Sequence, residues 1–199
     1  KYKLAHIWGA ESYSFVVGDD VYEELHNAMV KALYFQRCGC ALEEKYAGKY
    51  THGACHTNQV TVWSDRSKTF ECTGGWHDAG DYGRYITPAA VTIGHLVYAY
   101  EKYPTAFEAD LNIPESGNGV PDVLNECRYE LEWMLKMQLE DGGVYHKLTT
   151  QYHGDFMMPE EETEMYYAYD VSSMAVADFC AAMALCARVY RKYDVAFAK

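Results

Sequence analysis

The sequence predicts an all-α fold, and two observations support this prediction. Four long segments place apolar residues at helical spacing. Their expected ends fall at residues that commonly cap or break helices, such as aspartate, serine, proline and glycine. The chain of 199 residues is 49% apolar, which is enough for one compact domain with a sizeable core.

The composition of the chain argues for an uncharged partner. Its formal charge of −12 disfavours nucleic acid and anionic membrane surfaces, because like charges repel. No apolar run reaches the roughly 20 residues that span a bilayer, so we expect no membrane partner either. The 19 tyrosines suit contacts with sugar rings, although packing between helices explains any single tyrosine equally well.

The chain divides into two unequal parts. Residues 1–18 have apolar patches without a helical period, and we expect an extended segment or a linker from a preceding module. This part begins without Met or a signal-peptide pattern, which suggests a mature or trimmed start. The second part, residues 19–199, should open with a helix that Asp19 or Asp20 caps and that ends near Arg37. Its expected inner face consists of Leu25, Met29, Val30, Leu33 and Tyr34.

The next two helices are predicted at 88–102 and 121–139. Pro104 stops the first of them, and the glycine pair of 142–143 stops the second. In the first, the residues expected to face the core are Ile93, Leu96, Val97 and Tyr100. In the second, they are Leu124, Cys127, Leu131, Met134, Leu135 and Gln138.

A fourth helix should run from Ser172 or Ser173 to about Lys192, with a serine cap at its start. Its face of small residues suits close packing against another helix. The members of this face are Ala177, Cys180, Met183, Ala184, Ala187 and Tyr190. Residues 38–73 and 140–171 show little helical pattern and are far longer than usual connections, so we expect them to be functional or to be held by something other than a core.

The stretch 74–85, which reads GGWHDAGDYGRY, has the composition of a functional loop. Asp78 and Asp81 lie three residues apart among glycines, which let the backbone approach a ligand, and aromatic residues are nearby. Two carboxylates this close should raise the pKa of one of them and titrate as a unit. The alternative is an aspartate-rich turn that caps the following helix, and turn statistics alone favour neither interpretation.

The seven cysteines form no even framework of disulfides, which favours free thiols or metal ligation. One group of four residues offers the two thiolates and two imidazoles of a closed tetrahedral zinc site. Its members are Cys38, Cys55, His56 and His77. Such a site would hold residues 38–73 against the aspartate loop. The spacing lacks the tight pairs of a zinc finger, however, and Cys40 competes with Cys38 as a ligand. The remaining cysteines, Cys72, Cys127, Cys180 and Cys186, are expected to be buried thiols.

The motif DAGD at 78–81, followed by YGRY at 82–85, resembles the N-terminal catalytic signature of family 9 glycoside hydrolases. Four further motifs occur in the order and rough spacing that are typical of this family. They are QRCG at 36–39, ACH at 54–56, NIPESGNGVPD at 112–122 and DGGVYHK at 141–147. The resemblance therefore covers nearly the whole chain.

The family consists of inverting cellulases built on an (α/α)6 barrel. The resemblance implies that this chain supplies about the first third to half of such a barrel, and that its partner is the remaining part of the catalytic domain. Without that part, apolar helix faces would be left uncovered. The resemblance also implies a secreted enzyme that hydrolyses β-1,4-glucosidic bonds in cellulose or related β-glucans with inversion.

By the same resemblance, Asp81 is the general base and Asp78 helps to hold the attacking water. The two aspartates cannot be the acid and base of an inverting enzyme, whose carboxylates stand about 6.5–9.5 Å apart. The resemblance places the general acid on a glutamate beyond Lys199. The acidic run of Glu160, Glu161, Glu162 and Glu164 is expected to be a solvated loop and not the acid.

Five residues are predicted to bind sugar: Trp76, Tyr82, Arg84, Tyr145 and His146. By resemblance, His146 lines the cleft near the scissile bond and hydrogen-bonds the substrate. The alternative for His146 is a loop histidine that is satisfied by a backbone carbonyl. Trp76 could equally be a core ring under the loop.

The resemblance also bears on metals. Some family members carry a structural zinc at the ACH motif and at the histidine before DAGD, which favours the zinc site here. It also favours Cys38 over Cys40, because Cys38 matches the cysteine of QRCG. A calcium ion is possible in an oxygen-rich loop, although capping of a helix by Asp122 explains much of that pattern. This loop contains Asn112, Glu115, Ser116, Asn118 and Asp122, to which no ligand role is assigned.

Two other functions stay open at this point. In a metal-dependent hydrolase, His77, Asp78 and Asp81 would ligate a catalytic metal. A zinc site closed by two cysteines and two histidines, without contact to Asp81, would argue against that function. The chain could also be a non-catalytic carbohydrate-binding fragment.

Overall fold

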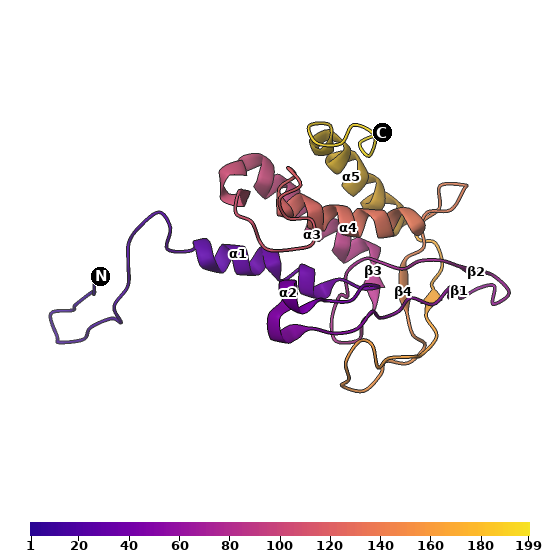
Figure 1. Ribbon diagram of the computed structural model, residues 1–199, viewed down its shortest axis with the longest axis horizontal. Helices are drawn as coiled ribbons and strands as arrows, with labels where there is room; N and C mark the ends of the chain where they lie inside the picture. The colour runs from indigo at the N-terminus through magenta and orange to yellow at the C-terminus, as the bar shows by residue number, and fades with distance from the viewer.

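Three long helices form the main body of the molecule (Figure 1). They are α3 (Ile86–Lys102), α4 (Asp122–Lys136) and α5 (Ser173–Tyr190) in a computed structural model that describes residues 1–199. α3 packs against both α4 and α5. The main hydrophobic core lies where these three helices meet, and it extends under the aspartate loop through Trp76 and Trp133.

The structure confirms these three helices to within a few residues of their predicted ends. Ser172 caps α5, since its Oγ accepts a hydrogen bond from the Ala175 amide at 3.0 Å. The inner face predicted for α3 is correct at Ile93, Val97 and Tyr100, which are all buried. In α4, Leu135 is exposed, because the helix ends at Lys136 and its last turn reaches solvent; Gln138 lies beyond the helix and is exposed as well.

The inner face predicted for α5 is wrong. Its buried residues are Ala175, Phe179, Ala182, Cys186, Val189 and Tyr190. Of the predicted face only Tyr190 is buried, and Cys180 is exposed instead of being a buried thiol. The helix is apolar nearly all the way round, so its sequence period does not select one face. By length and composition alone α5 could cross a membrane, a test that core helices also pass.

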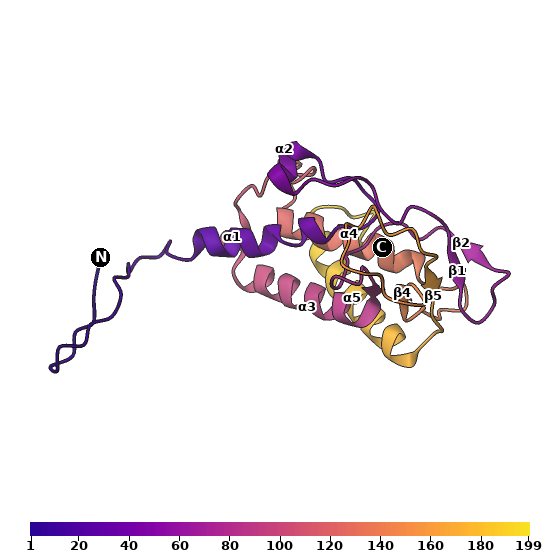
Figure 2. The same cartoon turned by 90° about the horizontal axis from the view of Figure 1, so that it is seen from below.

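The first helix is shorter than predicted. α1 spans only Glu23–Lys31, and a 3₁₀ turn, η1 (Tyr34–Gln36), follows it. Tyr22 occupies the N-cap position without a side-chain cap bond, so neither predicted aspartate caps the helix. Leu25 and Met29 are exposed, because α1 projects from the body toward the N-terminal segment (Figure 2) and only its C-terminal part reaches the core.

Residues 1–18 extend away from the body as two stretches that run side by side (Figures 1 and 2). Tyr2 and Phe15 exchange two backbone hydrogen bonds of 2.7 and 2.9 Å, and Ala5 pairs with Glu11. The apolar side chains at the tip, Ile7 and Trp8, are exposed.

The two long stretches predicted to be irregular contain most of a small sheet, so the fold is not purely helical. The strands are β1 (Val60–Val62), β2 (Thr69–Phe70), β3 (Arg84–Tyr85), β4 (Lys147–Thr149) and β5 (Tyr167–Ala168), in the spatial order β2-β1-β5-β4-β3. Only β1 and β5 are parallel, with Thr61 opposite Tyr167. Strands this short are below the length at which an alternating pattern can be recognised. The short helical turns are α2 (Glu44–Ala47), η2 (Gly48–Tyr50) and η3 (Pro104–Phe107).

A close approach under the aspartate loop gives a test of the packing. Gly75 has a φ of +80°, and a Cβ built on it would lie 2.7 Å from the Trp133 ring. We expect Gly75→Ala to lower the free energy of unfolding by about 2–4 kcal/mol, because backbone strain and overpacking add. Urea denaturation measures this change.

Gly142→Ala is the matched control. Gly142 has a φ of +87°, but nothing lies within 4 Å of its built Cβ. Only the backbone strain applies there, so we expect a loss of about 1 kcal/mol. Equal losses in the two variants would contradict a tight contact with Trp133.

Candidate functional site

Backbone pairing brings the QRCG motif to the aspartate loop. The Cys38 amide donates to the Gly75 carbonyl at 2.8 Å, and the His77 amide donates to the Gln36 carbonyl at 2.7 Å. Arg37 and Trp76 face each other in this antiparallel bridge. Two segments about forty residues apart are thereby fixed in register, which places Cys38 beside His77.

Arg37 anchors this pairing from below. Its guanidinium is buried and donates to both oxygens of Glu126 at 2.9 and 3.1 Å and to both oxygens of Glu115 at 2.8 and 3.0 Å. Buried charges need such bidentate partners to offset their lost hydration. Burial raises the pKa of Glu126, and the neighbouring Arg37 opposes this shift.

Arg84 and Glu130 support the glycines that precede the aspartates. The fully buried Arg84 guanidinium donates to the carbonyls of Cys72 and Gly74 at 2.8 and 2.7 Å. Glu130, on α4, accepts a 2.6 Å bond from the Trp76 amide. Backbone groups that lack a regular partner are thus satisfied by buried side chains. Burial raises the pKa of Glu130 to about 8.

The two aspartates lie on a tight turn between Trp76 and β3. The Asp78 amide donates to the Gly83 carbonyl at 2.8 Å, which closes the turn. The Asp81 carboxylate accepts bonds from the Gly83 amide at 3.2 Å and from the Tyr85 hydroxyl at 3.1 Å. These two donors orient the Asp81 carboxylate, whereas Asp78 is exposed at the surface.

The electrostatics of the pair agree with two carboxylates that influence each other. Partial burial, and to a smaller extent the charge of Asp81, raises the pKa of Asp78. Burial and the same charge raise the pKa of Tyr85 to about 12, so the hydroxyl stays protonated and donates to Asp81 at neutral pH. The expected direction of the shift is correct, but burial contributes more than the neighbouring charge.

Three of the predicted sugar-binding residues lie in or under the aspartate loop. Trp76 is buried in the main core, which matches its alternative interpretation as a core ring. Arg84 is also fully buried, because it holds the backbone under the loop. Tyr82 is partly exposed and has a φ of +53°, and its hydroxyl donates to the Met157 carbonyl. Only Tyr82 of these three is open to a ligand in this chain.

The other two residues, Tyr145 and His146, precede β4. The Tyr145 ring stacks on Phe70 with centroids 5.5 Å apart. The His146 carbonyl accepts from the Ile86 amide at 3.2 Å, which places His146 next to the start of α3. Its Nδ1 lies 3.5 Å from the Ser172 hydroxyl, and the side chain is half-buried. The structure therefore brings His146 to the strand that carries Tyr85, while its contact with substrate stays a prediction.

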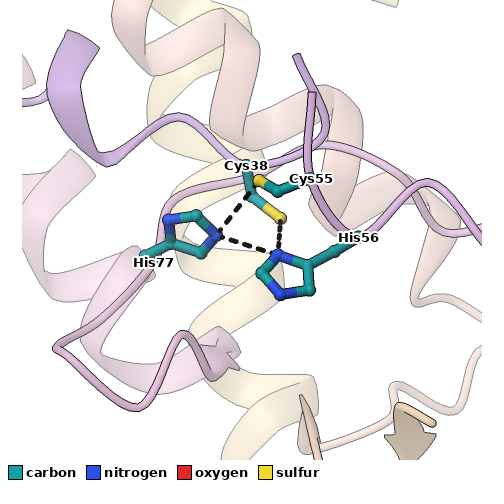
Figure 3. Close-up of side chains that lie close together, drawn as sticks. All are labelled: Cys38, Cys55, His56 and His77. Atoms are coloured by element: carbon teal, nitrogen blue, oxygen red, sulfur yellow. Dashed lines mark hydrogen bonds between the residues drawn. The ribbon is translucent and has the colours of Figure 1, made fainter. Parts of the chain in front are cut away.

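The four predicted metal ligands converge in one cluster (Figure 3). Their ligand atoms all lie within 4.8 Å of one another. The His56 Nδ1 is 3.5 Å from Cys38 Sγ and 3.3 Å from His77 Nε2, and Cys55 Sγ is 3.7 Å from that Nε2. Tetrahedral zinc, with bonds of about 2.3 Å to sulfur and 2.0–2.1 Å to nitrogen, sets its ligands about 3.3 Å apart for two nitrogens and 3.5–3.6 Å for a sulfur and a nitrogen. The donor set therefore fits this ion.

The protonation states also suit a metal. Hydrogen bonding by Cys38, and then by the two histidines, lowers the pKa of Cys55 to about 2, so one thiolate is available. Burial raises the pKa of Cys38. Burial lowers the pKa of His77, which favours its neutral, ligating form.

The members of the cluster answer two questions that the sequence left open: whether Cys38 or Cys40 belongs to it, and whether His77 is grouped with the aspartates. Cys38 belongs to it and Cys40 does not, as predicted. His77 is grouped with two thiols and His56, and not with Asp78 and Asp81. The geometry therefore gives no support to a catalytic metal between His77 and the aspartates.

Two residues near the site were missed. His153 Nδ1 lies 3.5 Å from the Asp81 carboxylate. Glu162 is buried with its carboxylate 3.4 Å from His56 Nε2, so the expectation of a solvated acidic run is wrong at this position, while Glu160, Glu161 and Glu164 are exposed. No local pattern marks either residue, because both contacts depend on how the long loop 150–166 folds back.

The oxygen-rich loop at 112–122 is held by protein contacts. Both Glu115 oxygens bind Arg37, and Asp122 accepts from the Ser116 hydroxyl at 2.6 Å and from the Leu111 amide at 2.8 Å. These bonds leave the carboxylates engaged with protein donors. A calcium ion in this loop stays a prediction.

Comparison with known proteins agrees with the motifs. The family model of glycosyl hydrolase family 9 matches residues 22–199. A cellodextrinase of Butyrivibrio fibrisolvens is 41% identical over the whole chain, which corresponds to 37% of that protein. The chain thus spans little more than a third of the length of this relative.

Solved structures of family 9 endoglucanases also resemble this chain. A metagenome-derived family 9 endoglucanase is 40% identical with a TM-score of 0.88, over 96% of this chain and 36% of that one. A Zn-binding triple mutant of the family 9 endoglucanase J30 is 33% identical with a TM-score of 0.88, over 95% of this chain and 37% of that one.

The buried Glu130 gives a test of the support under the loop. Its pKa is about 8 in the folded chain against 4.5 for a free side chain, so between these pH values the unfolded state loses a proton that the folded state keeps. The carboxyl therefore destabilises the fold increasingly as the pH rises through this range. Glu130→Gln keeps the acceptor for Trp76 without this ionisation. We expect the stability of the variant relative to wild type to increase by about 4 kcal/mol from pH 4.5 to 8.

Chemical denaturation across this pH range measures the difference. Glu140→Gln, at an exposed position just after α4, is the control and should follow the wild-type curve. Parallel curves for Glu130→Gln and wild type would contradict a protonated buried carboxyl.

Proposed function

This chain belongs to glycosyl hydrolase family 9, and from that premise we propose that it carries the catalytic base of an enzyme that hydrolyses β-1,4-glucosidic bonds in cellulose or related β-glucans with inversion. The observation that carries the proposal is the aspartate turn. Asp81 is oriented by the Gly83 amide and the Tyr85 hydroxyl, and Asp78 stands exposed beside it. This arrangement suits a base that must hold one water molecule in a fixed direction.

In the proposed reaction, Asp81 accepts a proton from a water molecule while the water oxygen attacks the anomeric carbon. Asp78 holds the second hydrogen of this water and so fixes its orientation. The bond to the leaving sugar oxygen breaks as a carboxylic acid on the opposite face donates a proton to that oxygen. The anomeric configuration inverts because only one displacement takes place.

The acid must come from another part of the protein. Asp78 and Asp81 share one turn and lie on the same side of any bound sugar. We propose that a glutamate in the remaining part of the catalytic domain serves as the acid, and that this part completes an (α/α)6 barrel around α3, α4 and α5. A polymeric substrate of this kind is met outside the cell, so we also propose a secreted protein.

We further propose that Cys38, Cys55, His56 and His77 hold a structural zinc ion. The donor set and its spacing support this ion, and all four positions are filled by protein ligands, as in structural zinc sites. When bound, the ion contributes folding free energy and joins residues 38–56 to the loop at His77. One solved structure with a similar fold, that of a triple mutant of endoglucanase J30, is described as Zn-binding.

Substitution of the base tests the proposed reaction. We expect Asp81→Asn in the full-length protein to reduce kcat on a soluble β-glucan by about 10²–10⁴-fold, because asparagine cannot accept the proton. Reducing-sugar release measures the rate, and thermal unfolding checks that the variant folds.

Asp19→Asn, in the exposed segment far from the loop, is the charge-matched control and should retain activity. Undiminished turnover by folded Asp81→Asn protein would overturn the proposal. A wild-type protein that binds glucan without cleaving it would instead favour a non-catalytic carbohydrate-binding role.

Metal analysis tests the zinc site. We expect one zinc per chain, and we expect its removal by a chelator to lower the melting temperature. At a free zinc concentration a thousand times the Kd, binding stabilises the fold by about 4 kcal/mol. Cys38→Ser should lose both the zinc and this stabilisation, whereas Cys40→Ser, two residues away and outside the cluster, should retain them. Equal zinc content in the two variants would refute the ligand set.

A further inference from the structure

One carboxylate of the acidic run at 160–164, that of Glu162, is buried. The Glu162 side chain is only 3% exposed, whereas Glu160, Glu161 and Glu164 are exposed. A buried carboxylate is costly unless hydrogen bonds or opposite charges compensate it. Glu162 therefore needs hydrogen-bond or charged partners, whereas its exposed neighbours do not.

The first partner is the cluster histidine His56. The Glu162 Oε2 lies 3.4 Å from His56 Nε2, and the His56 side chain is only 2% exposed. The other ring nitrogen, Nδ1, faces Cys38 and His77, so the two nitrogens of this ring point in opposite directions (Figure 3). Neither His56 Nε2 nor Glu162 Oε1 makes a hydrogen bond, so the approach of Nε2 to Oε2 is a close contact between the two side chains.

This geometry determines which nitrogen of the His56 imidazole carries the proton when a metal is bound. A neutral histidine has one N–H and one nitrogen lone pair. If Nδ1 directs its lone pair at a metal, the proton must lie on Nε2, which faces the Glu162 carboxylate. Histidine ligands commonly donate their second N–H to a carboxylate, which fixes the tautomer and makes the ligand more basic.

The second partner is Tyr166, which leads to the aspartate loop. Its buried hydroxyl donates to Glu162 Oε2 at 2.6 Å and lies 3.2 Å from the carbonyl of Tyr82, within reach of the same proton. Tyr82 directly follows Asp81. Its ring also packs against the rings of His56 and His77, with centroids 5.8 and 5.0 Å away. A continuous set of contacts thus connects the cluster with the residue after the base.

We propose that Glu162 is a positioning residue that orients His56 for metal binding and, through Tyr166, connects the metal cluster to the backbone of the aspartate loop. This inference rests on the zinc site proposed above and goes beyond it, because it gives a role to two residues outside the ligand set. Glu162 is neither a ligand nor the general acid in this role.

The location of the carboxylate supports this role over simple packing. Glu162, His56, Tyr166 and Arg84 line the same cavity of about 400 Å³. The Tyr166 hydroxyl donates to the Glu162 carboxylate, and the His56 ring lies 3.4 Å from the same oxygen, so the carboxylate stands between the metal cluster and Tyr166.

The test measures zinc affinity in the full-length protein by competition with a chromophoric chelator. We expect Glu162→Gln to weaken zinc binding by about 10–100-fold, since loss of a carboxylate partner of a histidine ligand has this effect in other sites. Glu164→Gln, which removes an exposed carboxylate from the same run, should leave the affinity unchanged. Tyr166→Phe should keep most of the zinc affinity but lower the turnover of glucan, because it removes the hydroxyl that joins Glu162 to Tyr82 and leaves the contact of Glu162 with His56 in place.

A second readout separates positioning from a purely structural role. In zinc-loaded wild-type protein, the His56 Nε2 proton should be protected from exchange and shifted downfield in the NMR spectrum, and Glu162→Gln should lose this shift. If wild type binds no zinc, the proposed metal site itself fails. If wild type binds zinc and Glu162→Gln has the same affinity and the same proton signal, only the role of Glu162 is overturned. A variant that lowers zinc-free stability without changing zinc affinity would overturn it as well.

Discussion

The short antiparallel pairing of residues 36–38 with 75–77 is the constraint on which the rest of the site depends. Two backbone hydrogen bonds fix the register, and the buried Arg37 between them is held by Glu115 and Glu126. This register places Cys38 next to His77, and His77 directly precedes Asp78. A shift of one residue would turn Cys38 away from the cluster, because side chains alternate along an extended segment.

Buried polar side chains compensate for the lack of regular structure around the aspartates. A loop rich in glycine leaves carbonyls and amides without helix or sheet partners, and such groups are costly to bury unpaired. Arg84 satisfies two carbonyls from one side, and Glu130 satisfies the Trp76 amide from α4. Arg84, which the sequence analysis predicted to bind sugar, therefore supports the backbone of the aspartate loop instead.

Sequence reasoning succeeded where one local signal determined the structure. The serine cap of α5 and the apolar stripe of α3 were visible as patterns, and the motif QRCG correctly selected Cys38 over Cys40 as a member of the Cys/His cluster. It failed where the outcome depended on contacts distant in sequence. The strands of two or three residues exist because β1 and β5 meet across a hundred residues, and Glu162 is buried because its loop folds onto His56. The apolar stripe of α5 encircles the helix, so only packing against α3 selects its inner face.

The proposed mechanism calls for several independent restraints, because an inverting reaction leaves little positional freedom. In the proposed mechanism, the base and acid sit on different segments of the protein, and the water between them must stay in line with the bond that breaks. The turn that carries Asp81 has strained backbone at Tyr82, with a φ of +53°, and would relax if it were unsupported. Pairing with 36–38 holds its first residues, Arg84 and Glu130 hold it from below, and Tyr166 holds it just after the base. The restraint through Tyr166 reaches the metal cluster by way of Glu162, and the pairing with 36–38 places Cys38 and His77 in that cluster, so a metal bound there would help to hold the turn that carries Asp81.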